Sequence, residues 1–307
     1  MPRQNYYHGF SPKRKNKVPA FRDTLIHLRL PFSAFLAPVY FFALSESPDT
    51  DRADALWVFI ILHLLLFPAI NAYNSYYDKD EGRIGLIEKP PPVSGLLLYT
   101  AIGMDLAAIV LSLLLDLGAP FTIYLVLYGL ASKAYSHPWI RLKKYAVISL
   151  LTVAIFQGFY TFLAVHEAIS ATGQPALPGL FLPAILCSCN LIAVYPLTQI
   201  YQHGEDRKHG DFTYSMLVGI RGTFLHGSIF FTLSFIGFGY LYLSENQGIS
   251  WLLFSIFMLP AIVFFLYWWR KTASDVSEAS YRNTMRMNAL ASAGLNAFFI
   301  ILCLMKQ

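Results

Sequence analysis

Two short polar stretches follow apolar runs in this chain, and both are dense in carboxylates. They read "NSYYDKDEG" at residues 74–82 and "QHGEDRKHGDFT" at residues 202–213, and their acids are Asp78, Asp80, Glu81, Glu205, Asp206 and Asp211. Carboxylates this close together repel one another unless a cation lies between them. Mg²⁺ suits such oxygen ligands and is usually held by a few carboxylates together with substrate phosphates. The acids therefore predict a Mg²⁺ site, and the metal in turn predicts an anionic ligand.

Each stretch also places an amide and a carboxylate four residues apart. The pairs are Asn74 with Asp78 and Gln202 with Asp206. Residues four apart lie on one face of a helix. Both pairs end apolar runs that cross in the same direction, four runs apart, so the pattern suggests a weak internal repeat. We expect two polar helix ends that face each other across a helical bundle.

Basic residues are interleaved with these acids or lie in the next polar loop. They are Lys79, Arg83, Lys89, Lys133, Arg141, Lys143, Lys144, Arg207 and Lys208. Acids and bases mixed on the same loops fit a Mg²⁺–phosphate site better than a simple charged surface. Taken singly, each basic residue is also explained as a solvated loop charge that marks membrane topology.

The elements that must position these residues are apolar helices. The chain is 56% hydrophobic and only 13% charged, whereas soluble domains carry about 25% charged residues. Continuous apolar runs of roughly 17–22 residues can cross the hydrocarbon core as helices, and runs of this kind argue against a barrel. We place them near 28–45, 55–76, 95–115, 119–136, 146–166, 178–200, 223–243, 250–269 and 287–305.

This pattern predicts an all-α integral membrane protein, a bundle of nine transmembrane helices. No polar linker divides the apolar runs, so we expect one domain over residues 25–307, preceded by a basic cytoplasmic tail at residues 1–24. The tail contains "PKRKNK" at residues 12–17, which marks the inside face and could also touch anionic lipid.

The distribution of Lys and Arg predicts the orientation. With nine crossings, 21 of the 23 basic residues fall on one side of the membrane and two on the other. The positive-inside rule then places the N-terminus in the cytoplasm and the C-terminus outside. The same bias explains the net charge of +5, so no nucleic-acid partner is needed.

The first acidic stretch resembles a motif of the UbiA superfamily of intramembrane prenyltransferases, N-D-x-x-D-x-x-x-D. Asn74 and Asp78 match, whereas Ser75 and Gly82 stand where that family has acids. A proline-rich segment follows, "KPPPVSG" at residues 89–95, and it is similar to the family's R-P-L-P-S-G signature.

The second stretch and one further loop resemble the same superfamily. Residues 202–213 are similar to D-x-x-x-D-x-x-x-G-x-x-T through Asp206, Gly210 and Thr213, with Gln202 in place of the first Asp. The loop "AYSHPWIRLKK" at residues 134–144 resembles a Tyr-Ser-x-Pro-x-x-R-L-K segment. Each match is weak alone, but four in the family's order make the resemblance strong.

The resemblance covers roughly residues 25–300 and implies a Mg²⁺-dependent transferase. Such an enzyme transfers the prenyl group of a polyprenyl diphosphate to a small acceptor, often an aromatic ring, and releases pyrophosphate. It implies Asp78 and Asp206 as catalytic residues. The expected metal ligands are Asn74, Asp78, Asp80, Gln202 and Asp206. The expected substrate-binding residues are Arg29, Lys89, Lys133, Tyr135, Arg141 and Lys143.

Several alternatives stay open at this point. Ser75 and Gln202 leave fewer carboxylates than usual, which leaves the number of Mg²⁺ ions open and allows a catalytically weakened homologue. A membrane transporter or ion-handling protein is a second class, although transporters place their charges near the bilayer midplane rather than at helix ends. No residue selects among quinone-ring, chlorin, haem or sugar- and glycerol-phosphate acceptors. We expect a multi-pass protein of a bacterial inner membrane whose active site opens to the cytoplasm.

Overall fold

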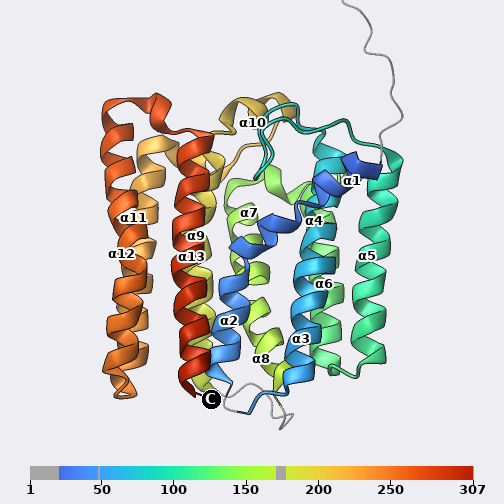
Figure 1. Ribbon diagram of the computed structural model, residues 1–307. Helices are drawn as coiled ribbons and strands as arrows, with labels where there is room; N and C mark the ends of the chain where they lie inside the picture. Colours follow the sequence, from blue (N-terminus) through green and yellow to red (C-terminus); the bar gives the residue numbers. More distant parts are fainter. Residues whose placement is uncertain (1–20, 48, 171–177, 307) are drawn as a thin grey trace, which may run out of the picture.

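The computed structural model describes residues 21–47, 49–170 and 178–306, and within these ranges the regular structure is helical apart from three isolated bridges. The helices stand side by side as a bundle (Figure 1). Five rods are continuous, namely α5 (Gly95–Leu114), α6 (Ala119–Ser136), α9 (Phe181–Gln199), α12 (Gly248–Ser274) and α13 (Tyr281–Lys306), and a sixth, α11 (Tyr214–Ser244), contains a kink at Gly219.

Three further rods are composite, because a short segment of different helical geometry interrupts each of them. They are α1 (Phe21–Leu28), η1 (Leu30–Phe35) and α2 (Ala37–Glu46); α3 (Arg52–Ile60), η2 (Ile61–Leu66) and α4 (Phe67–Asp78); and α7 (Ala146–Val153), η4 (Ala154–Tyr160) and α8 (Thr161–Ile169). Short helices lie between the rods: η3 (Leu142–Lys144), η5 (Pro178–Leu180), α10 (His203–His209) and η6 (Val276–Glu278).

Seven rods are long and apolar enough to cross a membrane. They span Arg52–Asp78, Gly95–Leu114, Ala146–Ile169, Phe181–Gln199, Tyr214–Ser244, Gly248–Ser274 and Tyr281–Lys306. The bent first rod would be an eighth, with 42° between its two halves. The rod α6 is not among them, since Tyr, Ser and Lys residues lower its hydropathy. An all-helical bundle of membrane-crossing rods is thereby confirmed, whereas the nine crossings and their orientation stay predictions.

Most rods begin and end close to the predicted ranges, but the first begins at Phe21 rather than at 28 and α13 at Tyr281 rather than at 287. In α11 a kink at Gly219, which has a positive φ of 69°, separates the first turns from the rest. The part after this kink begins close to the predicted position 223. The predicted tail is described only from Phe21, where α1 begins, and residues 1–20 lie outside the described residues.

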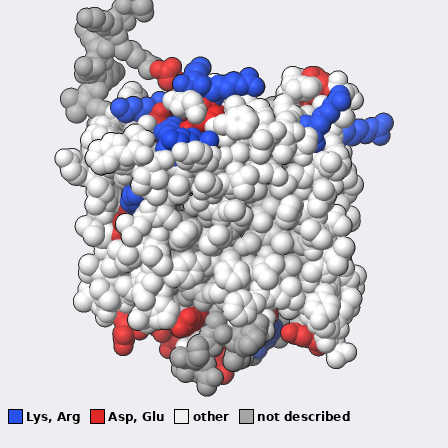
Figure 2. Space-filling model, turned by 180° about the vertical axis from the view of Figure 1, so that it is seen from behind, with Lys and Arg blue, Asp and Glu red and all other residues white. Residues whose placement is uncertain are grey.

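The two ends of the bundle differ in charge. We call the end that carries residues 79–94, 137–145, 200–213 and 275–280 the basic end. Lys and Arg gather there, and a broad band almost free of charge separates it from the opposite end (Figure 2). Helix α1 lies at the basic end, and α13 finishes at the opposite end (Figure 1). The uncharged band is the surface that a bilayer requires.

A serine of α9 supports the interruption in the rod α7–η4–α8. The Ser188 hydroxyl donates to the Ala154 carbonyl at 2.7 Å and accepts from the Phe159 N–H at 3.1 Å. These two bonds satisfy backbone groups that the π-helical turn η4 displaces from their ordinary α-helical partners. Gly158 permits the close approach, because a Cβ there would lie 2.8 Å from the Ser188 nitrogen.

Aromatic side chains fill the half of the bundle that lies away from the basic end. Phe42 of α2 stacks on Phe299 of α13 with 4.5 Å between ring centroids, and Phe238 of α11 lies 5.2 Å from Phe42. All three rings are nearly fully buried. This packed half is a rigid base on which the other half encloses a cavity.

We predict that Gly158→Ala destabilises the bundle by about 2 kcal/mol, since the added methyl would meet backbone rather than a movable side chain. Thermal unfolding in detergent measures the effect. Gly103→Ala of α5 is the matched control, because nothing lies within 4 Å of its Cβ position. It should unfold at or slightly above the wild-type midpoint. Equal midpoints for the two variants would contradict the role given to the α9–η4 contact.

Candidate active site

A cavity of about 300 Å³ lies inside the half of the bundle nearer the basic end. Its polar lining includes Arg29, Asn71, Asn74, Tyr135, Tyr195 and Thr198, from the broken first rod and from α4, α6 and α9, and further polar residues come from α7, η4 and α13. Its floor is formed by the aromatic rings of Phe42, Phe238 and Phe299. The cavity is therefore polar where the acidic stretches lie and apolar toward the bundle centre.

The first acidic stretch begins in the last turn of α4. Asn74 lines the cavity, and Asp78 follows one turn later with an exposed fraction of only 5%. The helix ends there because Lys79 takes a left-handed conformation (φ 50°), with its N–H bonded to the Ser75 carbonyl at 3.1 Å. This cap turns the chain sharply, so the next acid, Asp80, points away from the helix axis.

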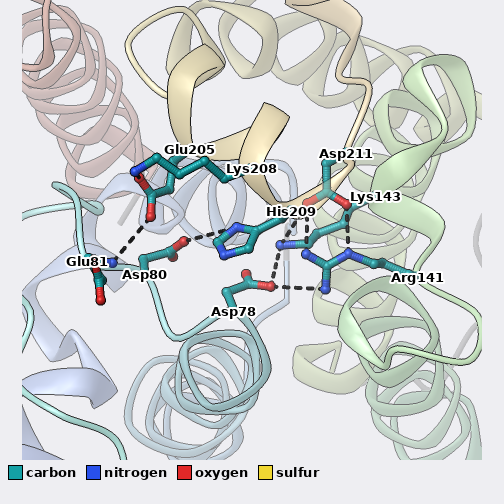
Figure 3. Close-up of polar contacts among 9 residues, drawn as sticks. All are labelled: Asp78, Asp80, Glu81, Arg141, Lys143, Glu205, Lys208, His209 and Asp211. Carbon is teal, nitrogen blue, oxygen red and sulfur yellow. Dashed lines mark hydrogen bonds and ion pairs between the residues drawn. The ribbon is translucent and has the colours of Figure 1, made fainter.

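The second acidic stretch forms α10, and it meets the first. The Glu81 N–H donates to Glu205 Oε1 at 3.4 Å, and Asp80 Oδ1 lies 3.9 Å from His209 Nδ1 (Figure 3). Gly210 ends α10 with a positive φ of 72°. The two acidic stretches, 120 residues apart in sequence, are therefore in direct contact beyond the end of α4, the helix whose Asn74 lines the cavity.

A third segment, residues 137–145, brings two cations between the acids. Arg141 donates from Nε to Asp211 Oδ1 at 2.7 Å and from Nη2 to Asp211 Oδ2 at 2.9 Å. Lys143 Nζ lies 2.5 Å from Asp78 Oδ1 (Figure 3). Two cations thus join the first acidic stretch to the second.

Asp211 is absent from the ligand set that the sequence predicted. It is only 3% exposed, and its carboxylate accepts hydrogen bonds from both Nε and Nη2 of Arg141. The sequence did contain a signal, since Asp211 belongs to the same acidic stretch and follows the glycine that ends α10. No family motif position assigns it a role, however, and its partner lies in a distant loop.

Burial and mutual repulsion raise the affinity of these acids for protons. Burial is the main cause that raises the pKa of Asp206 to about 7; Lys143 opposes the shift, and the carboxylates of Asp211, Asp80 and Asp78 reinforce it. Burial, followed by the charge of Asp78, also raises the pKa of Asp80. A cation bound beside these carboxyl groups would favour their ionised form.

The donor set fits a divalent cation. Asp206 Oδ2 is buried and has no hydrogen-bond partner among the described residues. Asp80, Glu205 and His209 each offer a ligand atom, and these three atoms lie within 4.8 Å of one another. Carboxylate oxygens that are inward-facing and short of partners are what a hard cation such as Mg²⁺ requires.

Of the predicted substrate-binding residues other than Arg141 and Lys143, two lie at the cavity. Arg29 and Tyr135 line the cavity. Arg29 is held by a bond from Nη2 to the Asn71 carbonyl at 3.1 Å, while its buried Nε has no hydrogen-bond partner. The Tyr135 hydroxyl is hydrogen-bonded to that of Tyr195. Both side chains present polar atoms to a ligand in the cavity.

Lys133, Lys89 and Gln202 lie elsewhere. Lys133 forms an ion pair with Asp105 of α5, and its ammonium lies 5.0 Å from the Tyr73 ring centroid, so it does not line the cavity. Lys89 is exposed in the loop after α4. Gln202 precedes α10 and lines a separate surface hollow. The roles predicted for these three residues stay predictions.

The loop after α4 crosses the basic end of the bundle (Figure 1) and packs on a residue that lines the cavity. Reciprocal backbone bonds of 3.0 and 2.7 Å close a turn between Ile84 and Ile87. Gly85 within this turn packs on Phe32, a lining residue, so closely that a Cβ would lie 2.5 Å from the ring. The His27 ring donates to the Pro91 carbonyl at 2.8 Å and ties the loop to α1.

Comparison with known families identifies this architecture. The model of the UbiA prenyltransferase family matches residues 32–290, and the chain belongs to that family. No curated protein matches the sequence significantly.

Solved structures show the same fold at low sequence identity. A UbiA homolog from Archaeoglobus fulgidus bound to DMAPP and Mg²⁺ has a TM-score of 0.66 and 17% identity, covering 92% of this chain and 99% of that one. The same homolog bound to GPP and Mg²⁺ gives 0.65 and 16%, with the same coverage. A structure described for digeranylgeranylglyceryl phosphate synthase gives 0.61 and 16%, covering 92% and 98%.

We predict that Arg141→Gln destabilises the protein by about 3 kcal/mol, because it leaves Asp211 buried without its main partner. The double variant Arg141→Gln/Asp211→Asn removes the uncompensated charge and should recover much of the loss. Thermal unfolding in detergent of both variants and of Asp211→Asn completes the cycle. If the double variant is as unstable as the sum of the single ones, the two residues are not coupled and the assignment is wrong.

Proposed function

We propose that this protein is a Mg²⁺-dependent intramembrane prenyltransferase. Its donor would be a polyprenyl diphosphate and its product the prenylated acceptor with free pyrophosphate. The observation that carries the proposal is the direct contact of two acidic stretches beyond the end of α4, the helix whose Asn74 lines a cavity with an aromatic floor. Family membership supports it, and relatives of the same fold bind DMAPP or GPP together with Mg²⁺.

Each part of a prenyl diphosphate has a counterpart in the site. Asp78, Asp206 and Asp80 are the residues that would hold Mg²⁺, which when bound neutralises phosphate charge and stabilises the departing pyrophosphate. Arg141 and Lys143 provide positive charge beside these acids. Charge-assisted bonds from such groups to phosphate oxygens are short and strong.

The cavity below suits the reacting carbon and the prenyl tail. An allylic carbon gains positive charge as its bond to the diphosphate lengthens, and aromatic faces stabilise such charge. Tyr135 and Phe32 line the cavity on its polar side. The loop over Phe32 excludes water from this region, which protects a cationic centre from hydrolysis.

The orientation and the acceptor complete the proposal. The basic end would face the cytoplasm, since it carries nearly all Lys and Arg, and the opposite end would face outside. The acceptor would be a small molecule that reaches the same cavity from that side or from the bilayer, within a bacterial inner membrane. The lining contains neutral hydroxyl and amide groups beside Arg29, which is compatible with a polar aromatic ring.

We predict that Asp78→Ala and Asp206→Ala each lower Mg²⁺-dependent pyrophosphate release by about a hundredfold or more, the usual scale for loss of a charge-stabilising group. The assay uses GPP and membranes as the source of acceptor. Asp54→Ala is the matched control, because this partly exposed acid lies near the start of α3, at the opposite end of the bundle. Chelation of Mg²⁺ should abolish release by the wild type.

Full release by either variant would refute the proposed site. If the wild type released no pyrophosphate with any prenyl diphosphate yet bound divalent ions, an ion-handling protein would replace the transferase. Failure to bind donor with Mg²⁺ present would indicate a homologue without catalytic activity.

A further inference from the structure

Two cations of the loop 137–145 are shared unequally between the two acidic stretches. Arg141 makes bonds of 2.7 and 2.9 Å to Asp211, but only a 3.4 Å contact to Asp78. Lys143 has the opposite preference, with 2.5 Å to Asp78 and 3.5 Å to Asp211 (Figure 3). The main partner of Arg141 is therefore Asp211, whereas the main partner of Lys143 is Asp78.

The pair of Arg141 with Asp211 is built to stay together. A guanidinium and a carboxylate joined by two parallel bonds are held in one geometry. The backbone of both partners is also fixed: the Arg141 N–H bonds to the His137 carbonyl at 2.8 Å, and the Asp211 N–H bonds to the Asp206 carbonyl at 2.9 Å. Asp211 is thus a buried anchor for Arg141.

The contact of Lys143 with Asp78 is built differently. An ammonium is a compact charge on a flexible stem, so it makes a point contact without a fixed fork geometry. The side chain of Lys143 is about as exposed as that of Arg141, 13% against 14%, but no second short bond holds its head group. A stronger anion within reach can therefore take this ammonium away without unfolding the loop.

The Asp78 carboxylate cannot pair fully with both the Lys143 ammonium and a divalent metal ion. The ammonium of Lys143 neutralises it in the structure, whereas a divalent ion needs the same carboxylate free. A diphosphate carries more negative charge than one carboxylate and is the better partner for Lys143.

We propose that Lys143 is an exchangeable counter-ion, which neutralises Asp78 until a diphosphate arrives and then moves to the phosphate oxygens. Asp211 is a positioning residue that holds the Arg141 fork and so keeps this second cation from pairing fully with Asp78. This inference rests on the proposed function, because it takes a prenyl diphosphate as the ligand.

The exchange couples the two ligands of the site. The diphosphate releases Asp78 to the metal, and the metal in turn favours diphosphate binding. Linkage requires both effects to be equal in size. Without diphosphate the site would hold divalent ions weakly, so its acids would not bind metal unproductively.

The experiment measures two affinities of the purified full-length protein in detergent. The first is for Mn²⁺ alone, read from the loss of the free-ion EPR signal. The second is for radiolabelled pyrophosphate at saturating Mg²⁺. Lys143→Met should bind Mn²⁺ alone about tenfold more tightly than the wild type, since a neighbouring opposite charge changes a carboxylate's cation affinity by this order or more. The same variant should bind pyrophosphate about tenfold more weakly.

Matched variants separate this result from a general loss of structure. Lys144→Met removes the neighbouring charge, whose ammonium lies over the Tyr145 ring, and should leave both affinities unchanged. Lys143→Arg keeps the charge and should keep weak Mn²⁺ binding. Asp211→Asn frees Arg141 to join Lys143 at Asp78, so it should weaken binding of both Mn²⁺ and pyrophosphate, and Asp211→Glu should restore part of each.

Lys143→Met is expected to raise the affinity for Mn²⁺ and to lower the affinity for pyrophosphate. Loss of a lysine with only a structural role would not change the two affinities in opposite directions. If the Mn²⁺ affinity of this variant is unchanged or lower, the proposed exchange of Lys143 is wrong. If pyrophosphate still binds the wild type in a Mg²⁺-dependent manner, the proposed function survives that result. If the wild type binds no pyrophosphate with Mg²⁺, the proposed function and the exchange both fail.

Discussion

The structure depends on one electrostatic constraint, the need to keep several carboxylates together at the end of an apolar bundle. Asp78 and Asp211 are almost fully buried, and like charges in such surroundings repel strongly. Arg141 and Lys143 resolve this in the protein by lying between them. The loop that carries these cations is consequently fixed, and with it the relation of α4 to α10.

The helices meet a second constraint. They direct polar side chains into the cavity without leaving backbone N–H and C=O groups unpaired. The left-handed conformation of Arg29 breaks the first rod and directs its side chain into the cavity. The Ala34 carbonyl beyond the break is satisfied by Ser292 and Asn296 of α13. In the rod α7–η4–α8, the Ser188 hydroxyl pairs with the backbone groups of Ala154 and Phe159 in the same way. Side chains of neighbouring rods thus compensate each interruption, as backbone groups in hydrocarbon require.

The sequence reveals the rods and the meeting of the acidic stretches, because both depend on local pattern. Run length sets the helices, and the amide-to-carboxylate spacing puts Asn74 and Asp78 on one face. It does not reveal which charges pair. Lys133 is drawn to Asp105 instead of the cavity, which depends on how α5 and α6 are rotated. The bond between Arg141 and Asp211 joins loops 70 residues apart, and no spacing rule connects them.

The aromatic base under the cavity has a consequence for the membrane itself. A protein with a hydrated, charged opening on one side is a potential leak for protons and metal ions. Phe42, Phe238 and Phe299 are buried against one another and form the floor of the cavity in the described part of the bundle. An apolar floor of this kind would oppose the passage of ions, so that the ion gradients across the bilayer would be preserved.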